Sequence, residues 1–374
     1  MRYRRMGDLN VSILGLGAMR LPLKADGKKI DKRETDRMIR YGIERGINYI
    51  DTAAPYHDGR SEEVVGKILS AGLRDKVLLA TKLPCWLVQT AADFDRLLQE
   101  QLRKLRTDRI DVYLLHALFT ERWEGVRRLG VLDWLEKKKA AGVIGRVGFS
   151  FHDNFEVFKQ ILNAYDKWDM CQIQYNYMDE DFQAGTLGLR LASARNVPVV
   201  VMEPLRGGFL AAPPASIRSL FDEADLHPVR AALRWLWAKP EITTVLSGMS
   251  NLRQVTENAD LADASEKVTL SEAEVETIGK ARAAYEKAAP IPCTQCGYCL
   301  PCPSGVAIPD NISLYNKCVI FDNIESGKVQ YLYHTPDPLK AAACTGCREC
   351  EDKCPQRIPV SEWMPKIDRA FTTE

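Results

Sequence analysis

Short apolar runs alternate with longer amphipathic segments over the first three quarters of the chain. The runs are rich in Val, Ile and Leu, and the segments between them carry charged residues with apolar positions recurring every three to four residues. This alternation predicts strands buried on both faces, each followed by a helix. We expect strands at 13–17, 47–52, 76–82, 110–116, 146–150, 170–175, 197–203 and 243–247.

Between these strands, the periodic segments 31–46, 61–69, 91–105 and 132–141 predict helices. Asp31, Ser61 and Ser271 stand where a side-chain oxygen would cap a helix start. Eight regular βα units predict an α/β fold, a closed (β/α)8 TIM barrel. A doubly wound open sheet is the alternative, but the early GLGAM at 15–19 lacks the third glycine of a dinucleotide fingerprint and runs into RLPLK rather than a helix.

The composition changes near residue 288, where prolines become frequent, the helical pattern stops and cysteines begin. We therefore predict a barrel domain at 1–288 and a small, mostly helical domain at 289–374. Within the second domain, the stretch NISLYNKCVIFDNIESGK at 311–328 predicts helix.

Three ionisable residues stand at the ends of successive predicted strands: Asp51, Lys82 and His116. Tyr56 follows in the loop after Asp51. In a parallel barrel the strand ends share the catalytic face. A lysine ammonium would lower the tyrosine pKa from roughly 10, a carboxylate would keep the lysine charged, and a neutral imidazole would orient a carbonyl. The alternative for each residue alone is a structural ion pair or a packed core histidine.

From about residue 3 to residue 287, the sequence resembles the aldo-keto reductase family. The likeness rests on LGLGAMRLP, NYIDTAAPYHDGRSEEVVGKIL, LLATKLP, RIDVYLLHAL, GRVGFSFHD, CQIQYN, VVVMEPLRGG and SGMSNLRQVTEN. The pair D-T-A-x-x-Y and S-E-x-x-G is highly specific. The resemblance implies NAD(P)H-dependent reduction of a carbonyl substrate. It makes Tyr56 the general acid, tuned by Lys82 and Asp51, and makes His116 the residue that orients the carbonyl.

The same resemblance implies a nicotinamide site in which Ser150 and Gln172 meet the carboxamide. The remaining cofactor contacts it implies are Gly17, Ala18, Met19, Met202, Pro204, Leu205, Gly207, Gln254 and Asn258. Three positions depart from the family pattern. Phe151 replaces an asparagine, Met202 replaces an aromatic residue that stacks on the nicotinamide, and Gly248, Met249 and Gln254 stand where basic residues grip the 2′-phosphate of NADP. The neighbouring Arg253 could compensate, and both NADP and NAD stay open.

Trp86 and Trp123 follow the strands of Lys82 and His116 and could form apolar walls of a substrate pocket. Arg20 could pair with a substrate carboxylate. The alternative is that both tryptophans pack under loops and Arg20 is a solvated charge.

Nine of the eleven cysteines lie after residue 290. Two motifs hold eight of them, which are Cys293, Cys296, Cys299 and Cys302 before Pro303, and Cys344, Cys347, Cys350 and Cys354 before Pro355. Three cysteines at two-residue gaps followed by Cys-Pro are typical of two [4Fe-4S] clusters, and zinc is the alternative metal.

The cysteine region resembles the helical ferredoxin type found in dehydrogenase subunits, over about residues 290–360. By this resemblance one cluster uses Cys293, Cys296, Cys299 and Cys354, and the other uses Cys344, Cys347, Cys350 and Cys302. The first motif is one residue short before its last cysteine. Cys85, Cys171 and Cys318 fit neither motif, and we interpret them as small buried hydrophobes.

Nicotinamide delivers two electrons together, whereas iron–sulfur clusters pass one at a time, and a flavin commonly links the two. Three hypotheses follow. One is a carbonyl reductase whose clusters are structural or tune redox response. Another is an oxidoreductase exchanging electrons with a ferredoxin-type partner through a flavin or other mediator. The third is a nicotinamide-binding redox sensor. Oxidoreductase, with carbonyl reduction, is the leading prediction.

The net charge of the chain bears on the kinds of partner it could bind. The 51 basic and 50 acidic residues leave a formal net charge of +1, which favours neither nucleic acid nor an anionic membrane as a partner. No apolar run approaches the roughly 20 residues that span a bilayer. The start of the chain lacks the pattern of a signal peptide, so we expect a cytoplasmic protein.

Overall fold

A computed structural model describes residues 1–264, 269–293, 297–354 and 356–373. The chain forms two compact units. One comprises Met1–Leu210 and Val229–Ser271, and the other comprises Ala211–Pro228 and Glu272–Glu374. Helix α11 (Glu272–Ala288) groups with the second unit, and the domain boundary after residue 288 stays a prediction.

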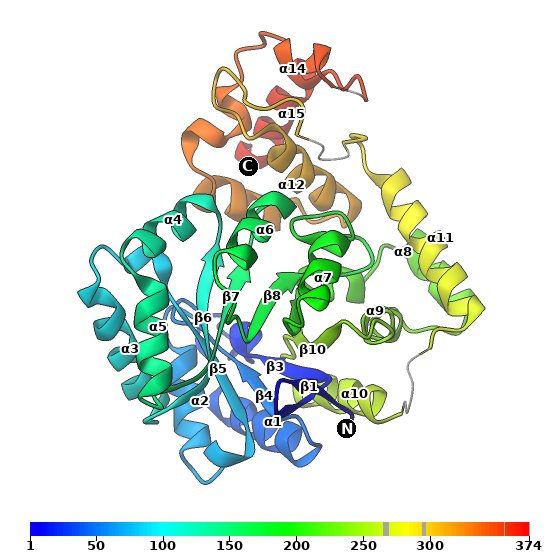
Figure 1. The fold of residues 1–374 in the computed structure, drawn as a ribbon. Helices are drawn as coiled ribbons and strands as arrows, with labels where there is room; N and C mark the ends of the chain where they lie inside the picture. Colours follow the sequence, from blue (N-terminus) through cyan, green and yellow to red (C-terminus); the bar gives the residue numbers. More distant parts are fainter. Residues whose placement is uncertain (265–268, 294–296, 355, 374) are drawn as a thin grey trace. The chain divides into compact units, whose positions relative to one another are not determined.

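The first unit is a closed barrel of eight parallel strands in the order β10-β3-β4-β5-β6-β7-β8-β9 (Figure 1). All eight predicted strands are confirmed. Because β10 pairs with β3 through Ser247 and Leu16, the sheet closes and the open-sheet alternative is wrong. The strands are β3 (Leu14–Gly17), β4 (Tyr49–Asp51), β5 (Leu78–Leu83), β6 (Ile110–Leu118), β7 (Ile144–Phe151), β8 (Met170–Gln174), β9 (Val199–Met202) and β10 (Ile242–Ser247).

Helices surround these strands, as the amphipathic segments predict. They are α1 (Lys32–Glu44), α2 (Ser61–Leu69), α3 (Ala92–Leu105), α4 (Thr120–Arg128), α5 (Val131–Ala140), α6 (Phe155–Asn163), α7 (Gly185–Ala194), α9 (Pro228–Trp237) and α10 (Leu252–Asp263). Short 3-10 turns are η1 (Ala18–Arg20), η2 (Arg74–Lys76), η3 (Cys85–Leu87) and η4 (Arg206–Ala211).

Two of the predicted helix caps can be compared with the structure. The side chain of Asp31 accepts from the backbone N–H groups of the first turn of α1, so this cap is confirmed. Ser61 does not cap α2, because it is the first residue inside the helix. Its hydroxyl instead donates to the Ala18 carbonyl at 3.0 Å and lies 2.9 Å from Thr52 Oγ1. The serine thus fixes α2 to the loops at the carboxyl end of the barrel.

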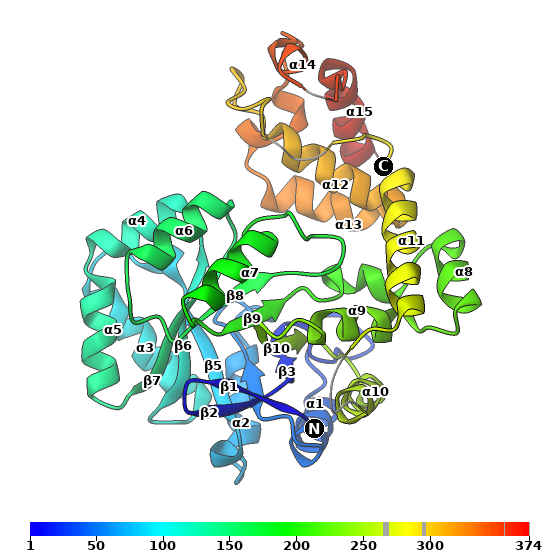
Figure 2. The same ribbon diagram turned by 45° about the vertical axis from the view of Figure 1, so that its right-hand side comes forward.

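A hairpin that the sequence did not predict precedes the barrel. It consists of the antiparallel strands β1 (Tyr3–Met6) and β2 (Leu9–Ser12), seen beside the N label in Figure 2. Met6 and Val11 are buried in a small core with Tyr49, Met170 and other residues of the barrel strands. The hairpin therefore closes the amino-terminal end of the barrel.

The second unit is helical, as predicted. Its helices are α8 (Ala215–Glu223), α11, α12 (Ile308–Ile320), α13 (Ile324–Val329), α14 (Glu349–Asp352) and α15 (Val360–Thr372), with turns η5 (Gln330–His334), η6 (Asp337–Leu339) and η7 (Ala341–Ala343). α12, α13 and α15 pack together (Figure 2) around a core that includes Ile312, Ile367 and Phe371. Among the described residues, no helix is long and apolar enough to cross a membrane.

Candidate active site

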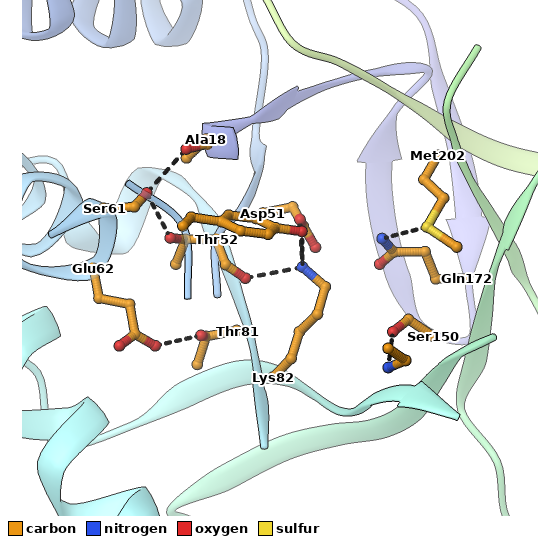
Figure 3. A network of polar contacts seen from close by, with 12 residues as sticks. Ala18, Asp51, Thr52, Ser61, Glu62, Thr81, Lys82, Ser150, Gln172 and Met202 are labelled. Atoms are coloured by element: carbon orange, nitrogen blue, oxygen red, sulfur yellow. Dashed lines mark hydrogen bonds and ion pairs between the residues drawn. The ribbon is translucent and has the colours of Figure 1, made fainter. Parts of the chain in front are cut away.

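Three of the four predicted catalytic side chains meet at the carboxyl ends of β4 and β5. Lys82 Nζ donates to Asp51 Oδ1 at 2.6 Å, to the Thr52 carbonyl at 2.9 Å and to the Tyr56 hydroxyl at 3.2 Å. Figure 3 shows Lys82 reaching toward Asp51. Strand pairing places Asp51 opposite Ala80, two residues before Lys82, so the barrel itself brings the ion pair together.

Burial sets the ionisation of this group. Burial raises the pKa of Asp51, and the Lys82 charge opposes that shift. Burial alone would lower the pKa of Lys82, but the nearby Asp51 and Tyr56 oxygens raise it overall, so the ammonium is the favoured form. Burial also raises the pKa of Tyr56, and Lys82 counteracts this only in part. Lys82 therefore lowers the tyrosine pKa as expected, but burial outweighs the ammonium and the net shift of the Tyr56 pKa is upward.

His116 joins the same site from β6, with its ring 6.2 Å from the Tyr56 ring in an edge-on arrangement. Burial, followed by the positive charge of Lys82, holds its pKa well below 6.5, so the imidazole is neutral. Its Nδ1 is buried without a hydrogen-bond partner among the described residues. A neutral imidazole with an unused nitrogen suits hydrogen bonding to a ligand.

The backbone beside His116 is strained. Ala117 has a φ of +53°, a region that costs a non-glycine residue roughly 1–3 kcal/mol. Two contacts hold it there. The Ala117 N–H donates to Ser150 Oγ at 2.7 Å, and its carbonyl accepts from Arg122 Nη1 at 3.0 Å. These contacts fix the end of β6, and with it His116.

A cavity of about 270 Å³, hereafter the main hollow, opens at these strand ends. Its walls include all four predicted catalytic residues. Of the predicted cofactor contacts, its walls also include Gly17, Met19, Ser150, Gln172, Met202, Pro204, Leu205 and Gly207. Ala18, Gln254 and Asn258 do not line it.

The main hollow offers matched groups for a carboxamide. Gln172 Nε2 contacts Met202 Sδ at 3.6 Å, and Gln172 Oε1 is buried without a partner within the described chain. Ser150 Oγ accepts from Ala117 and keeps its own proton available. A carboxamide carries both a donor and an acceptor, so it would satisfy the orphaned Gln172 oxygen and the serine proton. These residues fit a nicotinamide ring.

The three predicted contacts outside the hollow have other partners. Ala18 is buried and its carbonyl accepts from Ser61. Asn258 is buried and donates to Ser247 Oγ at 3.1 Å, while the exposed Gln254 accepts from the Ser250 N–H at 2.7 Å. Asn258 is thus one hydrogen bond behind Ser247, which does line the hollow.

Two arginines bear on recognition of a 2′-phosphate, and of these Arg20 lines the main hollow whereas Arg253 does not. Arg253 is 85% exposed and pairs with Glu257 at 2.6 Å. Arg20 lies across Gly248, where an added Cβ would stand 3.1 Å from Arg20 Cδ, and its Nη2 would be 3.3 Å from a Cβ on Gly207. The lack of a side chain at Gly248 therefore makes room for Arg20 in the wall of the main hollow.

The two predicted tryptophan walls behave differently. The Trp86 ring is 41% exposed and lies 5.1 Å from the His116 ring, as a pocket wall would. Trp123 is buried, with Trp168 6.4 Å away, so the expectation that it lines a pocket is wrong and the packing alternative holds. Phe151, at the departure from the family pattern, is also fully buried, against Phe158.

Sequence reasoning missed Arg122, His152 and Glu203. His152 and Glu203 line the main hollow, and Arg122 lies with Trp86 in an adjoining cavity. His152 and Glu203 follow the ends of β7 and β9 directly, so the strand-end rule would have found them. Arg122 sits inside α4, and only the fold reveals its position.

In the second unit, Cys293, Cys299 and Cys354 line one cavity with Ile308 and Ile312. These three belong to one predicted ligand set, whose fourth member, Cys296, lies outside the described residues. Across the described parts of the chain, no three acidic, histidine or cysteine side chains converge closely enough to hold a single metal ion. A cubane cluster instead spreads its four thiolates over separate iron corners.

The other predicted ligand set is less enclosed. Cys350 is buried near Cys344 and Cys299, and burial, followed by these neighbours and Glu351, raises its pKa to about 11. Cys347 is exposed and Cys302 half-buried. Outside the motifs, Cys85, Cys171 and Cys318 are all buried, as their interpretation as small hydrophobes predicts.

Comparisons with known proteins agree with this architecture. Residues 13–283 match the aldo/keto reductase family, and residues 292–358 match a 4Fe-4S dicluster domain. An uncharacterized oxidoreductase of Bacillus subtilis, YqkF, is 27% identical over 71% of this chain and 92% of its own. Methylglyoxal reductase YeaE of Escherichia coli is 28% identical over 74% and 92%.

Solved structures give the same result. The holo form of an aldo-keto reductase from Bacillus halodurans is 28% identical, covers 75% of this chain and 96% of its own, and superposes with a TM-score of 0.62. An aldo/keto reductase from Klebsiella pneumoniae in complex with NADP and acetate is 26% identical over 72% and 91%, with a TM-score of 0.58. The chain therefore belongs to the aldo/keto reductase family and carries a 4Fe-4S dicluster domain after its barrel.

Proposed function

We propose that the protein reduces a carbonyl compound with NADPH or NADH, and that Tyr56 is the proton donor. The observation that carries the proposal is the buried contact of Lys82 with both Asp51 and Tyr56, at 2.6 and 3.2 Å, in the wall of the main hollow. The reduced nicotinamide would supply a hydride to the carbonyl carbon. Support for NADP over NAD comes from the Klebsiella pneumoniae relative, which was solved with NADP.

The residues of the chain then have distinct roles. Tyr56 keeps its proton at neutral pH because burial raises its pKa, and it gives that proton to the carbonyl oxygen as negative charge develops there. Lys82 stabilises the tyrosine oxygen that remains, since its ammonium is 3.2 Å away. Asp51 keeps Lys82 charged and in place. His116 donates a hydrogen bond to the same carbonyl oxygen and orients it.

A Tyr56→Phe variant tests the proposal. The protein is purified without oxygen, and NADPH oxidation is followed with methylglyoxal, the substrate in the name of the Escherichia coli relative. Loss of general-acid catalysis should lower kcat/KM by about 10²–10⁴-fold. NADPH binding, measured by fluorescence titration, should stay within a factor of two. Tyr333→Phe, at a residue 79% exposed and outside both cysteine motifs, is the matched control. A Tyr56→Phe variant with full activity would refute the mechanism.

We also propose two [4Fe-4S] clusters with the ligand sets predicted from the motifs. The cavity shared by Cys293, Cys299 and Cys354 supports the first set, which joins a cysteine of the second motif to those of the first. Replacing Cys354 with Ala should lower iron and sulfide by about half, whereas Cys318→Ala should leave both unchanged. Loss of iron in the Cys318 variant, or none in the Cys354 variant, would contradict the assignment.

The alternative function is electron exchange with a ferredoxin-type partner, and the presence of a dicluster domain favours testing it. Adding NADPH without oxygen and recording the visible absorbance of the clusters separates the two functions. Bleaching would mean that electrons pass from nicotinamide to iron–sulfur through a mediator such as a flavin. Unchanged absorbance with NADPH bound would favour carbonyl reduction alone, with structural or tuning clusters. The intact group at Lys82 argues against a sensor that performs no chemistry.

A further inference from the structure

A second cavity of about 520 Å³, hereafter the side hollow, adjoins the candidate active site and shares Met19, Tyr56 and His116 with the main hollow. Arg122 lies in its wall, together with Trp86. Among the described residues, none that lines the side hollow is acidic. A ligand that binds at Tyr56 and His116 and enters the side hollow meets Arg122, whose charge is permanent.

Arg122 is held in place but not neutralised. Its Cζ lies 4.5 Å from the Phe119 ring centroid and 5.1 Å from the Trp86 ring centroid. One of its five N–H donors bonds to the Ala117 carbonyl at 3.0 Å. Within the described chain no carboxylate pairs with it, and burial lowers the pKa of its half-buried guanidinium. Among the described residues, the Ala117 carbonyl is the one hydrogen-bond acceptor of this guanidinium.

The distance from Arg122 to the reacting group suits one small molecule. The Trp86 ring centroid is 5.1 Å from that of His116 and 5.1 Å from Arg122 Cζ, so the His116 ring and the guanidinium contact the same indole and cannot be far apart. A carbonyl at His116 and an anionic group at Arg122 can belong to a single short chain lying along Trp86. An arginine packed on aromatic rings presents its edge, which matches a planar carboxylate in two parallel hydrogen bonds.

We propose that Arg122 selects carbonyl substrates that carry a carboxylate a few carbons from the aldehyde or ketone, that is, oxo acids. The inference rests on the proposed carbonyl reduction and names its substrate class. Arg20, which the sequence suggested for this role, lies instead between Gly207 and Gly248 and outside the side hollow. A carboxylate–guanidinium pair in such a site contributes enough binding energy for about 10- to 100-fold discrimination.

The test compares 4-oxobutanoate with its uncharged methyl ester. Wild-type protein should prefer the acid in kcat/KM, and Arg122→Met should lower the acid-to-ester ratio by about 10- to 100-fold. Arg127→Met, at an exposed position of the same helix, should leave the ratio unchanged. A ratio that Arg122→Met does not alter would overturn the inference. Glyceraldehyde 3-phosphate is a third substrate, and a preference for it over 4-oxobutanoate would overturn the choice of carboxylate.

A binding measurement keeps this inference separate from the proposed function. Calorimetric titration of the NADP-loaded protein with succinate, a non-reducible dicarboxylate, should give saturable binding that Arg122→Met weakens by at least about 10-fold. Succinate binding lost in the variant, together with no reduction of either carbonyl compound by wild type, would refute the reductase proposal and support the anion site. Reduction of both compounds with succinate affinity equal in wild type and variant would refute the anion site alone.

Discussion

Replacing Asp51 with Asn leaves Lys82 without its counter-charge while keeping the side chain's size. Both residues are almost fully buried, at 3% and 1% side-chain exposure, and their atoms are 2.6 Å apart. Removing one partner of such a pair costs about 3–5 kcal/mol, since the other charge stays buried. The Thr52 carbonyl and Tyr56 hydroxyl still accept from Lys82, so we expect the lower value, about 3 kcal/mol at pH 7.

The sign of the pH dependence follows from Lys82. In wild type its raised pKa means that the ion pair stabilises the fold below about pH 10.5 and less so as pH rises through the folded value. In Asp51→Asn the strongest group opposing burial is gone, so burial lowers the lysine pKa and the variant loses stability as pH falls below 10.5. The difference in unfolding free energy should therefore be largest near neutral pH and shrink toward pH 10.

Urea unfolding followed by tryptophan fluorescence measures this difference, because six of the seven tryptophans precede residue 240. The full set is wild type, Asp51→Asn, Lys82→Met and the double variant. If both single changes expose a buried unpaired charge or dipole, the double variant should lose less than their sum by at least about 1 kcal/mol. Additive losses, or an Asp51→Asn deficit that does not change with pH, would refute the electrostatic reasoning.

Three further outcomes follow from the structure. Below pH 6.5, the unfolding free energy of wild type should fall relative to that of His116→Gln by up to about 1.4 kcal/mol per pH unit, because the folded imidazole resists protonation. Parallel curves of unfolding free energy against pH for the two proteins would contradict this. Arg20→Met should weaken NADPH binding about 10-fold in a fluorescence titration, whereas Arg253→Met should leave the NADPH affinity nearly unchanged. A larger loss of affinity in Arg253→Met would place the phosphate contact on α10. Gly66→Ala should lower the free energy of thermal unfolding by at least about 2 kcal/mol, since a Cβ would lie 2.4 Å from the α3 backbone. Gly125→Ala, with open space around it, should raise that free energy by about 0.5–1 kcal/mol. Equal effects of the two changes would refute the packing argument.

The barrel could be predicted because its signals are local. Each strand is a short apolar run, and the alternation with amphipathic helices fixes a parallel order. The hairpin was missed because its strands contain polar residues, as in YRRM and LNVS, and so lack the continuous apolar run of the barrel strands. Ser61 looked like a helix cap since sequence shows a hydroxyl before an apolar segment but not the distant Ala18 carbonyl that binds it.

The candidate site could be predicted for ionisable residues at strand ends. It could not be predicted for residues whose role depends on tertiary packing. Asp51, Lys82 and His116 all end strands that the sequence locates. The direction of the Tyr56 pKa shift depends on how much protein surrounds it, and a sequence does not count those atoms. Trp86 and Trp123 follow similar positions after two strands, yet one lines a cavity and the other is core. Arg122 emerges only once α4 is placed beside β6.

Because the β1–β2 hairpin packs on one end of the barrel, the two ends should differ in how well they tolerate substitutions. Because Met6 and Val11 pack into an apolar core with residues of the barrel strands, substitutions at the amino-terminal end act chiefly on stability. Segments at the opposite end, such as the part of α4 that carries Arg122, can then change side chains without disturbing this core. In a library of random variants, losses of folded protein should concentrate near the hairpin, whereas changes in substrate preference should concentrate at the other end.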